Sequence, residues 1–248
     1  MPANMKVALV CIAKDEDEYI NEWIEYHKKL RFDQIFVFEN NWRCKVEDDT
    51  VTIIEFDGER KQIPAYNTFI ERFRYEYDWV AFLDVDEFVV LKKHENIKEF
   101  LNEYDGVENG IAINWVLFGS NGHKELSENT SMLERFTKRQ IDTNYHIKTF
   151  LKLKRFGMKM MNPHSPNVML NDTNLNEVIG PFNLRGDIEV AQINHYFCKT
   201  LPEFRKKVNR GCADKDAKRN IKEFESHDKN EVDDLLALNY SLYGKFGR

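Results

Sequence analysis

The first half of the chain alternates between strand-like and helix-like hydrophobic patterns. Four short apolar runs have the length and continuity of buried strands, at residues 7–12, 34–38, 51–56 and 79–84. Residues 17–30 carry apolar side chains at helical spacing, and a second helical pattern begins at Pro64, a residue type favoured in the first turn of a helix. Strands that alternate with helices predict right-handed crossovers and a largely parallel sheet.

The second half is less regular, and residues 124–146 are polar without a clean period, which indicates a long functional loop. The remaining patterns predict a short helix at 96–104 and strands at 110–118, 146–154 and 188–197. Thr200 and Glu203 have the spacing of a capping box, so a helix is expected to begin there. Two further helices are predicted at residues 214–226 and 230–240.

Composition indicates a soluble α/β protein. The 248 residues carry 42 acidic and 36 basic side chains, a net charge of −6, which argues against bulk binding of nucleic acid. Four widely spaced cysteines form no CxxC pair, so neither a zinc site nor a disulfide framework is indicated, and the cytoplasm is the expected compartment. No signal-like stretch opens the chain, and no apolar run approaches the roughly 18 residues of a membrane span.

The apolar run that begins at Trp79 stops at three carboxylates within four positions, Asp84, Asp86 and Glu87. Strand alternation places Asp84 and Asp86 on one side of the backbone, where oxygens from both can reach one hard cation. Like charges at the end of an apolar strand are unfavourable unless a positive charge lies between them. A divalent metal that holds a diphosphate meets that need. From this motif alone, a solvated strand end is the alternative.

Polar side chains also follow the first two predicted strands. Lys14, Asp15 and Glu16 follow the first strand, and Asn40 follows the second. The carboxyl ends of parallel strands share one edge of a sheet, and the ligands of such sheets bind beyond that edge. Together with the acidic motif, these groups therefore outline one expected cleft.

Seven short motifs follow one another along the chain. They are CIAKDE at 11–16, EWIEYH at 22–27, DVDEF at 84–88, NWVLFGSNGH at 114–123, ERF at 134–136, NHY at 194–196 and RG at 210–211. In this order the motifs resemble glycosyltransferases of the GT-A fold, and more narrowly a bacterial family 2-like group related to family 92. The order is more specific than any one motif. One departure is Asp15, where relatives usually carry asparagine.

The resemblance implies an α/β fold of the GT-A, Rossmann-like type, with a mixed, mostly parallel sheet flanked by helices. One such domain is expected over residues 1–211, with a helical C-terminal extension over 212–248 packed on it. The implied reaction moves a hexose from UDP-galactose or UDP-glucose to a hydroxyl of a glycan or lipid-linked glycan, with inversion, in the synthesis of a bacterial surface polysaccharide or lipooligosaccharide. Mn²⁺ or Mg²⁺ would bridge the diphosphate and act as a Lewis acid.

The resemblance also implies roles on the donor side. Asp84 and Asp86 would hold the metal or the donor ribose, and His195 is the candidate third ligand because imidazole suits manganese. A partly buried histidine without a ligand role is the alternative for His195. Donor contacts are expected from Lys14, Asp15, Glu16, Asn40, Asp84, Lys148 and Arg210. An ordinary surface cation is the alternative for both Lys148 and Arg210, and for Lys148 it is the favoured interpretation. Glu16 is equally compatible with stabilising a helix N-terminus.

An inverting transferase needs a general base for the acceptor hydroxyl. The candidates are Glu134, Asp142, Glu87 and His123. Glu134 is placed first because inverting GT-A enzymes carry the base after the corresponding strand and loop. An ion pair between Glu134 and Arg135, which would make Glu134 structural, is the alternative.

An apolar platform for the acceptor sugar is expected from Trp115, Phe118 and His123, with His164 as a further contact. A core position is equally compatible with Trp115, which lies inside a strand pattern. The helical pattern of residues 17–30 predicts that Trp23 and His27 pack in the core.

Two other function classes compete with a glycosyltransferase. A nucleotidyltransferase would carry a glycine-rich phosphate loop after the first strand, whereas residues 13–16 read AKDE. A non-catalytic carbohydrate-binding protein is opposed by the intact acidic motif and His195. Residues 235–246 place apolar side chains where they could support peripheral association with the inner face of the cytoplasmic membrane. Packing on the domain or a contact in a dimer explains them equally well.

Overall fold

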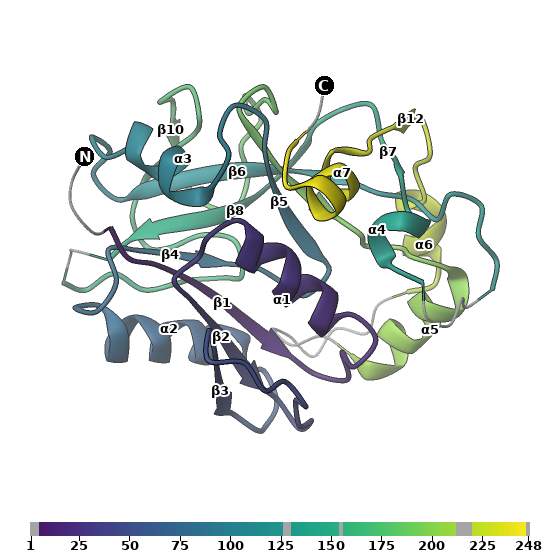
Figure 1. The fold of residues 1–248 in the computed structure, drawn as a ribbon, viewed down its shortest axis with the longest axis horizontal. Coiled ribbons are helices and arrows are strands. Elements are labelled where there is room, and N and C mark those ends of the chain that lie inside the picture. The colour runs from purple at the N-terminus through teal and green to yellow at the C-terminus, as the bar shows by residue number, and fades with distance from the viewer. Residues whose placement is uncertain (1–4, 126–129, 154–155, 212–219, 247–248) are drawn as a thin grey trace.

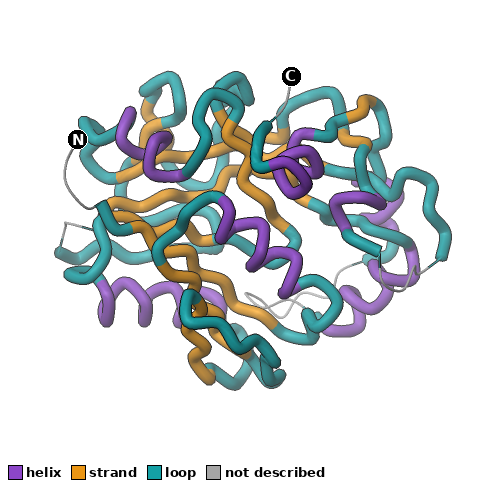
Figure 2. The backbone as a smooth tube through the Cα atoms, in the orientation of Figure 1, coloured by secondary structure: helices purple, strands orange, loops and turns teal. Residues whose placement is uncertain are grey.

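The computed structural model describes residues 5–125, 130–153, 156–211 and 220–246, which form a mixed ten-stranded sheet with helices on both faces (Figures 1 and 2). Its strands are β1 (Val7–Ala13), β2 (Gln34–Glu39), β3 (Val51–Glu55), β4 (Trp79–Phe82), β5 (Glu87–Leu91), β6 (Gly110–Leu117), β8 (Asn144–Lys152), β9 (Leu170–Asn171), β10 (Glu177–Val178) and β11 (Ala191–His195). The order across the sheet is β10-β9-β6-β8-β4-β1-β2-β3, and β11 pairs with both β5 and β6.

The helices are α1 (Ile20–Lys29), α2 (Gln62–Phe73), α3 (Ile97–Glu103), α4 (Met132–Arg135), α5 (Leu201–Arg210), α6 (Lys222–His227) and α7 (Leu236–Tyr243). Strand alternation divides the core between the two faces of the sheet. In β1, Leu9 and Cys11 belong to the apolar cluster that includes residues of α1, α3 and α7. Ala8 and Val10 belong to the second cluster, which α2 covers.

Strands β1 to β4 follow the predicted pattern, because β2 and β4 both pair with β1 in parallel and β3 extends the sheet from β2 in the same direction. The second half adds antiparallel pairs between β8 and β4, between β8 and β6, and between β11 and β5. An α/β fold with a sheet flanked by helices is therefore confirmed, and the sheet is mixed.

Several predicted element bounds were wrong. The predicted strand 79–84 ends at Phe82, because the chain turns there and returns as β5, which pairs with β11. Helix α1 begins at Ile20, three residues later than predicted. Helix α2 begins at Gln62, so Pro64 lies inside its first turn, where a missing N–H costs nothing.

The segment predicted as a long loop, 124–146, contains α4 and the short strand β7 (Lys138–Arg139), which pairs with β12 (Val232–Asp233); its residues 126–129 lie outside the described chain. The capping box is confirmed, because the Thr200 hydroxyl and the Glu203 carboxylate each bond the other residue's backbone at the start of α5. The helix predicted at 214–226 is described only from residue 220, where α6 occupies Lys222–His227. The helix predicted at 230–240 begins only at Leu236, as α7, because β12 occupies Val232–Asp233, and it runs on to Tyr243.

Helix α7 packs on the protein through one side. Ala237 and Tyr240 are buried, the Tyr240 hydroxyl donates to the carbonyl of Lys29 at 2.8 Å, and the Phe246 ring stacks on Tyr240 with centroids 4.1 Å apart. Tyr243 remains 70% exposed. Within the described residues, no helix combines the length and apolar character needed to cross a membrane. The predicted packing explanation thus accounts for Tyr240 and Phe246, and membrane association stays a prediction.

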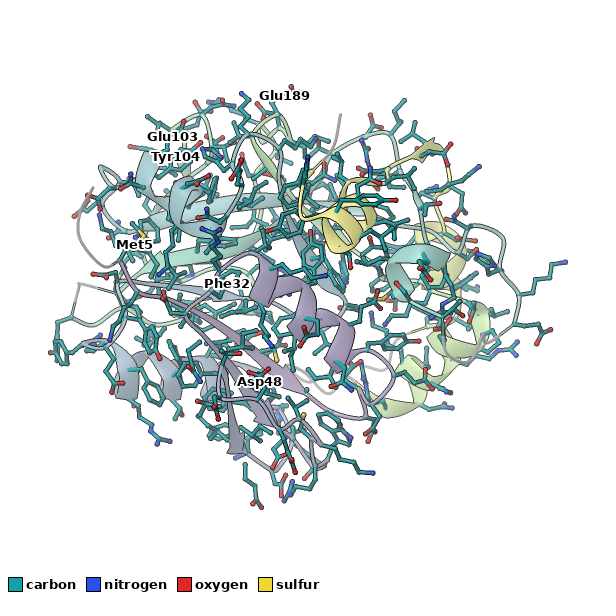
Figure 3. All side chains as sticks on the ribbon, in the orientation of Figure 1. Met5, Phe32, Asp48, Glu103, Tyr104 and Glu189 are labelled. Atoms are coloured by element: carbon teal, nitrogen blue, oxygen red, sulfur yellow. The ribbon has the colours of Figure 1, made fainter. Side chains whose placement is uncertain are left out.

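His27 lies in the core, as its helical spacing predicted. Its ring is fully buried among uncharged rings, including Phe32, which Figure 3 labels beside α1. Burial, only partly offset by a hydrogen bond to the carbonyl of Trp23, lowers the pKa of His27 to about 3.

This buried histidine predicts a specific acid sensitivity. The folded chain keeps His27 neutral, whereas the unfolded chain protonates it below about pH 6.5. Stability should therefore be lost as pH falls from about 6.5 toward 3. In His27→Leu, the proton uptake on unfolding at pH 5 should fall by about one proton. Urea unfolding measured at pH 5, 6, 7 and 8 gives this slope, and equal slopes for both proteins would contradict the prediction.

Candidate functional site

The acidic motif forms the turn between β4 and β5 at the carboxyl edge of the parallel strands. The Glu87 N–H donates to the carbonyl of Asp84 at 3.0 Å, and the Asp84 N–H donates to the Glu87 carboxylate at 2.8 Å. On the other side, the Tyr196 N–H donates to the carbonyl of Asp86 at 2.9 Å. The turn is therefore held by its own hydrogen bonds and by the chain that follows β11, which fixes the direction of both aspartates.

Asp84 and Glu87 share one buried lysine. The Lys148 ammonium lies 3.0 Å from an oxygen of each carboxylate, and the Gln62 amide donates to Asp84 at 2.7 Å. Lys148 and Glu87 have no exposed surface, whereas about a third of the Asp84 side chain is exposed. The interpretation of Lys148 as a surface cation was wrong, because β8 lies between β6 and β4 in the centre of the sheet.

One ammonium between two carboxylates can neutralise only one of them. Burial would raise the pKa of Asp84, but the charge of Lys148 outweighs it and the net shift is downward. Burial, strengthened by the negative charges of Asp84 and Asp86, raises the pKa of Glu87 well above its ordinary value. The arrangement therefore favours an ionised Asp84 and a Glu87 that retains its proton. The Glu87 carboxyl group then supports the turn by accepting the hydrogen bond from the Asp84 N–H.

The Asp86 carboxylate faces three side chains from β11 and the residues after it, those of His195, Lys199 and Lys207. The Lys207 ammonium lies 2.6 Å from one carboxylate oxygen, with the Lys199 ammonium 3.9 Å away, and the His195 Nε2 lies 3.6 Å from the other oxygen. All four side chains are at least nine-tenths buried. Burial would raise the pKa of Asp86, but Lys207 and His195 hold it well below its ordinary value. Burial lowers the pKa of His195 to about 4, so the imidazole is neutral at pH 7.

Helix α5 brings cations to this edge. Lys207 and Arg210 are three residues apart and share a helix face. Arg210 donates to the carbonyl of Lys14 at 2.6 Å and to the carboxylate of Glu16, which is buried. Glu16 therefore forms an ion pair with α5, and its backbone carbonyl accepts the bond that starts the turn before α1.

The start of α5 is anchored by a buried pair. The Arg135 guanidinium donates to both Glu203 oxygens, at 3.2 and 2.9 Å, and both side chains are less than a tenth exposed. Burial would raise the pKa of Glu203, but the bonds from Arg135 and Thr200 hold it at about 2. The alternative of an Arg135–Glu134 pair was wrong, since neighbouring residues of a helix point to different sides and Glu134 is exposed.

Asp86 and His195 are the residues of this site that could hold a divalent cation. One carboxylate oxygen already faces a neutral imidazole nitrogen, and the second ring nitrogen of His195 is buried without a hydrogen-bond partner. Oxygen with imidazole suits Mn²⁺, and such cations often take their remaining ligands from substrate phosphates and water. Asp84 instead faces Lys148 and Gln62, and among the described residues no group of three His, Cys, Asp or Glu side chains gathers at a cation position. The fit therefore rests on Asp86 and His195.

Trp115 lies beside His195 at the inner end of a group of rings. Their centroids are 4.2 Å apart, and the His164 ring lies 4.9 Å from Trp115 on another side. Burial lowers the pKa of His164 to about 3, so it too is neutral at pH 7. Trp115 is 8% exposed, and its Nε1 donor is buried without a partner.

The predicted platform of Trp115, Phe118 and His123 was wrong as a set. Phe118 has no exposed surface and packs on Tyr196. His123 is exposed, and its Nε2 bonds the carbonyl of Arg135 instead. The chain therefore separates three residues that the sequence placed together, because β6 ends at Leu117 and only Trp115 lies within it.

The candidate bases occupy different environments. Glu87 is fully buried against Lys148, whereas Glu134 and Asp142 are exposed, on α4 and before β8. On the donor side, Asn40 is buried and donates both amide hydrogens to the carbonyls of Phe56 and Gly58 at 2.9 and 2.8 Å. The roles predicted for these residues stay predictions.

Lys14 and Asp15 lead from β1 into the turn before α1. Asp15 is exposed and has a φ of +53°, a conformation that asparagine and aspartate tolerate better than most residues. The replacement of asparagine by aspartate is thus compatible with this backbone.

Sequence reasoning missed two cations at Asp86. Lys199 and Lys207 lie more than a hundred positions from the carboxylate that they contact. The available signal was the capping box, which places Lys207 and Arg210 on the second and third turns of one helix that follows the strand of His195.

A family model described as glycosyltransferase family 92 matches residues 58–231. A family 92 protein from Ricinus communis is 23% identical over 231 residues, which cover 84% of this chain and 38% of that protein. Another from Oryza sativa subsp. japonica is 24% identical over 105 residues, which cover 38% of this chain and 18% of that protein. The chain thus spans less than two fifths of the length of these relatives.

Proposed function

Because this chain belongs to glycosyltransferase family 92, we propose that it transfers a hexose from a nucleotide sugar to a hydroxyl group of a glycan, on a GT-A fold. The observation that carries the proposal is the turn between β4 and β5, which presents Asp86 to His195 at the carboxyl edge of parallel strands. This is the edge at which α/β sheets bind nucleotides.

Asp86 and His195 would hold Mn²⁺ or Mg²⁺, which when bound supplies positive charge to the diphosphate leaving group. The protein's own cationic side chains add to that positive charge. Lys207, Lys199 and Arg210 converge on the same edge and can donate to phosphate oxygens as the donor nucleotide leaves. Lys148 keeps Asp84 ionised and fixed, so that its exposed part can accept hydrogen bonds from the donor ribose or sugar.

The donor is proposed to be UDP-galactose or UDP-glucose, and the reaction to invert the anomeric centre. The acceptor oxygen then forms the new glycosidic bond, the bond to the diphosphate breaks, and the acceptor proton passes to a base. Both named relatives come from plants, so a role in bacterial surface polysaccharide synthesis rests on the sequence motifs alone.

Calorimetry of UDP binding with Mn²⁺ and with EDTA tests the donor site. We expect UDP to bind with Mn²⁺ and to lose at least about ten-fold in affinity with EDTA, and His195→Asn to lose a similar factor with Mn²⁺ because one ligand is missing. His94→Gln is the matched control, since His94 contacts Glu103 at the end of α3 and lies outside the site.

Binding of UDP that is indifferent to EDTA and to His195→Asn would remove the metal from the proposal. Failure of the wild-type chain to bind any UDP species in either condition would remove the UDP donor.

A further inference from the structure

We propose that Tyr145, His146 and Phe182 form the outer part of an acceptor-binding platform that takes the second sugar ring of an uncharged glycan. The platform rests on the proposed transferase function and deepens it, because it names the class of acceptor. It also replaces the sequence-predicted platform, from which only Trp115 remains.

The platform is a continuous row of rings that starts at the candidate active site. Trp115 stacks on His146, with centroids 5.0 Å apart and planes 23° apart. His146 contacts Phe182 edge to face at 4.8 Å and stacks on Tyr145 at 4.9 Å and 24°, and Tyr145 and Phe182 contact each other at 5.3 Å. Exposure rises along the row from 8% for Trp115 to 49% for Tyr145 and 48% for Phe182. The row therefore leads from Asp86 and His195 to the surface.

The outer rings are held in place by the backbone around them. The buried Asn114 amide donates at 2.9 Å to the carbonyls of both Asn144 and Asn183, which flank Tyr145 and Phe182. Tyr145 accepts a backbone bond from Asn183 at 2.8 Å, and His146 and Phe182 form an antiparallel bridge.

Gly186 packs against the same Asn114 side chain. A Cβ there would lie 1.8 Å from the Asn114 side-chain oxygen, so the close approach requires glycine. Two exposed rings fixed in this way lose little conformational entropy when a ligand binds.

Buried polar atoms at the inner end of the row point to a ligand. Trp115 Nε1 and His195 Nδ1 both lack hydrogen-bond partners, although both side chains are at least nine-tenths buried. An unmet buried polar group is unfavourable, and a sugar offers hydroxyl groups that both accept and donate. The C–H face of the adjoining sugar ring would lie against the apolar outer rings.

The position of the row favours the acceptor over the donor nucleotide. Lys14, Asp15 and Glu16 follow β1 and Asp84 follows β4, whereas Trp115 comes from β6 and Tyr145 from the start of β8. In the sheet, β8 and β6 lie on the opposite side of β4 from β1. The acidic turn after β4 therefore separates the nucleotide side from the ring platform.

Saturation-transfer NMR with methyl β-galactoside, lactose, cellobiose and chitobiose, in the presence of UDP and Mn²⁺, tests the platform. With the wild-type chain we expect saturation of both rings of at least one disaccharide. Tyr145→Ala and Phe182→Ala should each weaken that disaccharide's binding by about five-fold, while Phe182→Tyr and the exposed control Tyr75→Ala should not. Thermal melting confirms that each variant is folded.

Calorimetry of UDP binding to the same proteins distinguishes failure of the platform from failure of the proposed function. Unchanged UDP binding with loss of the disaccharide supports the platform. Loss of UDP binding in Tyr145→Ala or Phe182→Ala overturns it, because the rings would then stack on the nucleobase. A wild-type chain that binds UDP but none of the four sugars also overturns the platform while leaving the donor site intact, whereas a chain that binds no UDP fails the proposed function.

Discussion

Asp86→Asn is expected to lower glycosyl transfer by about 10²- to 10³-fold, the cost of removing one strong electrostatic contact from a transition state. The carboxylate is one-tenth exposed and faces Lys207 and His195, so its charge organises both sides of the site. Asparagine keeps the shape but removes the charge that holds a cation and the two lysines. Release of UDP from UDP-galactose and UDP-glucose, with disaccharide acceptors, measures the loss, and UDP affinity with Mn²⁺ should fall in parallel.

Asp49→Asn is the matched control, because Asp49 is exposed before β3 and outside the acidic turn. It should leave transfer within about two-fold of the wild-type rate, as ordinary surface changes do. If Asp86→Asn folds normally and keeps more than a third of the wild-type rate, the turn between β4 and β5 is not the centre of the reaction.

The contact between Asp86 and His195 shows what the sequence could predict. Both residues follow or end an apolar run, and the point where an apolar run stops predicts where its strand ends. Parallel strands then bring such ends to one edge without any knowledge of the loops. The pairing of His195 with Glu87 is different, because β11 and β5 are antiparallel and β5 was not predicted. Residues 79–91 are apolar on both sides of the turn, and only pairing with β11 reveals that the chain reverses there.

Lys148 shows why the environment of a site residue could not be predicted, because it was named as a candidate donor contact but not as a buried residue. A lysine inside a strand pattern usually marks a solvated face, and nothing nearby in the sequence distinguishes this one. Its environment is set by β4 and β6, which belong to other parts of the chain. Lys207 and Phe182 were missed for the same reason, because the role of each depends on contacts with residues that are remote in sequence.

The cations of the site belong to two groups that differ in burial. Lys148 has no exposed surface and its two partners are fixed by the turn, so it serves the fold as well as the site. Lys207 and Arg210 reach the site from α5, whose position depends on the Arg135–Glu203 pair. Substitution of Lys148 should therefore mainly lower the free energy of unfolding, whereas substitution of Lys207 or Arg210 should mainly weaken donor binding.

Lys148→Met is expected to destabilise the chain by about 3–5 kcal/mol, because it leaves the buried Glu87 and the adjacent Asp84 without their shared cation. Methionine fills a similar volume, so the loss reports charge more than packing. The control is Lys206→Met, because Lys206 and its partner Glu18 are both more than half exposed; an exposed pair of this kind contributes about 0–1 kcal/mol. Urea unfolding at pH 7 measures both changes, and a loss below about 1 kcal/mol for Lys148→Met would contradict the buried-pair account.

The pH dependence of that loss identifies its cause. Removing Lys148 leaves burial and the negative charge of Asp86 to act on Asp84, which raises the folded-state pKa of Asp84 above its value in the unfolded chain. A group with a raised folded-state pKa contributes stability below its unfolded pKa and loses it as pH rises through the folded pKa. The deficit of Lys148→Met should therefore shrink as pH falls from 7 toward 5, and Lys148→Met/Asp84→Asn should recover part of it at pH 7. A deficit that is equal at both pH values and unchanged in the double variant would mean that the lysine stabilises the sheet by packing, so that the charge of Asp84 must be held by another group.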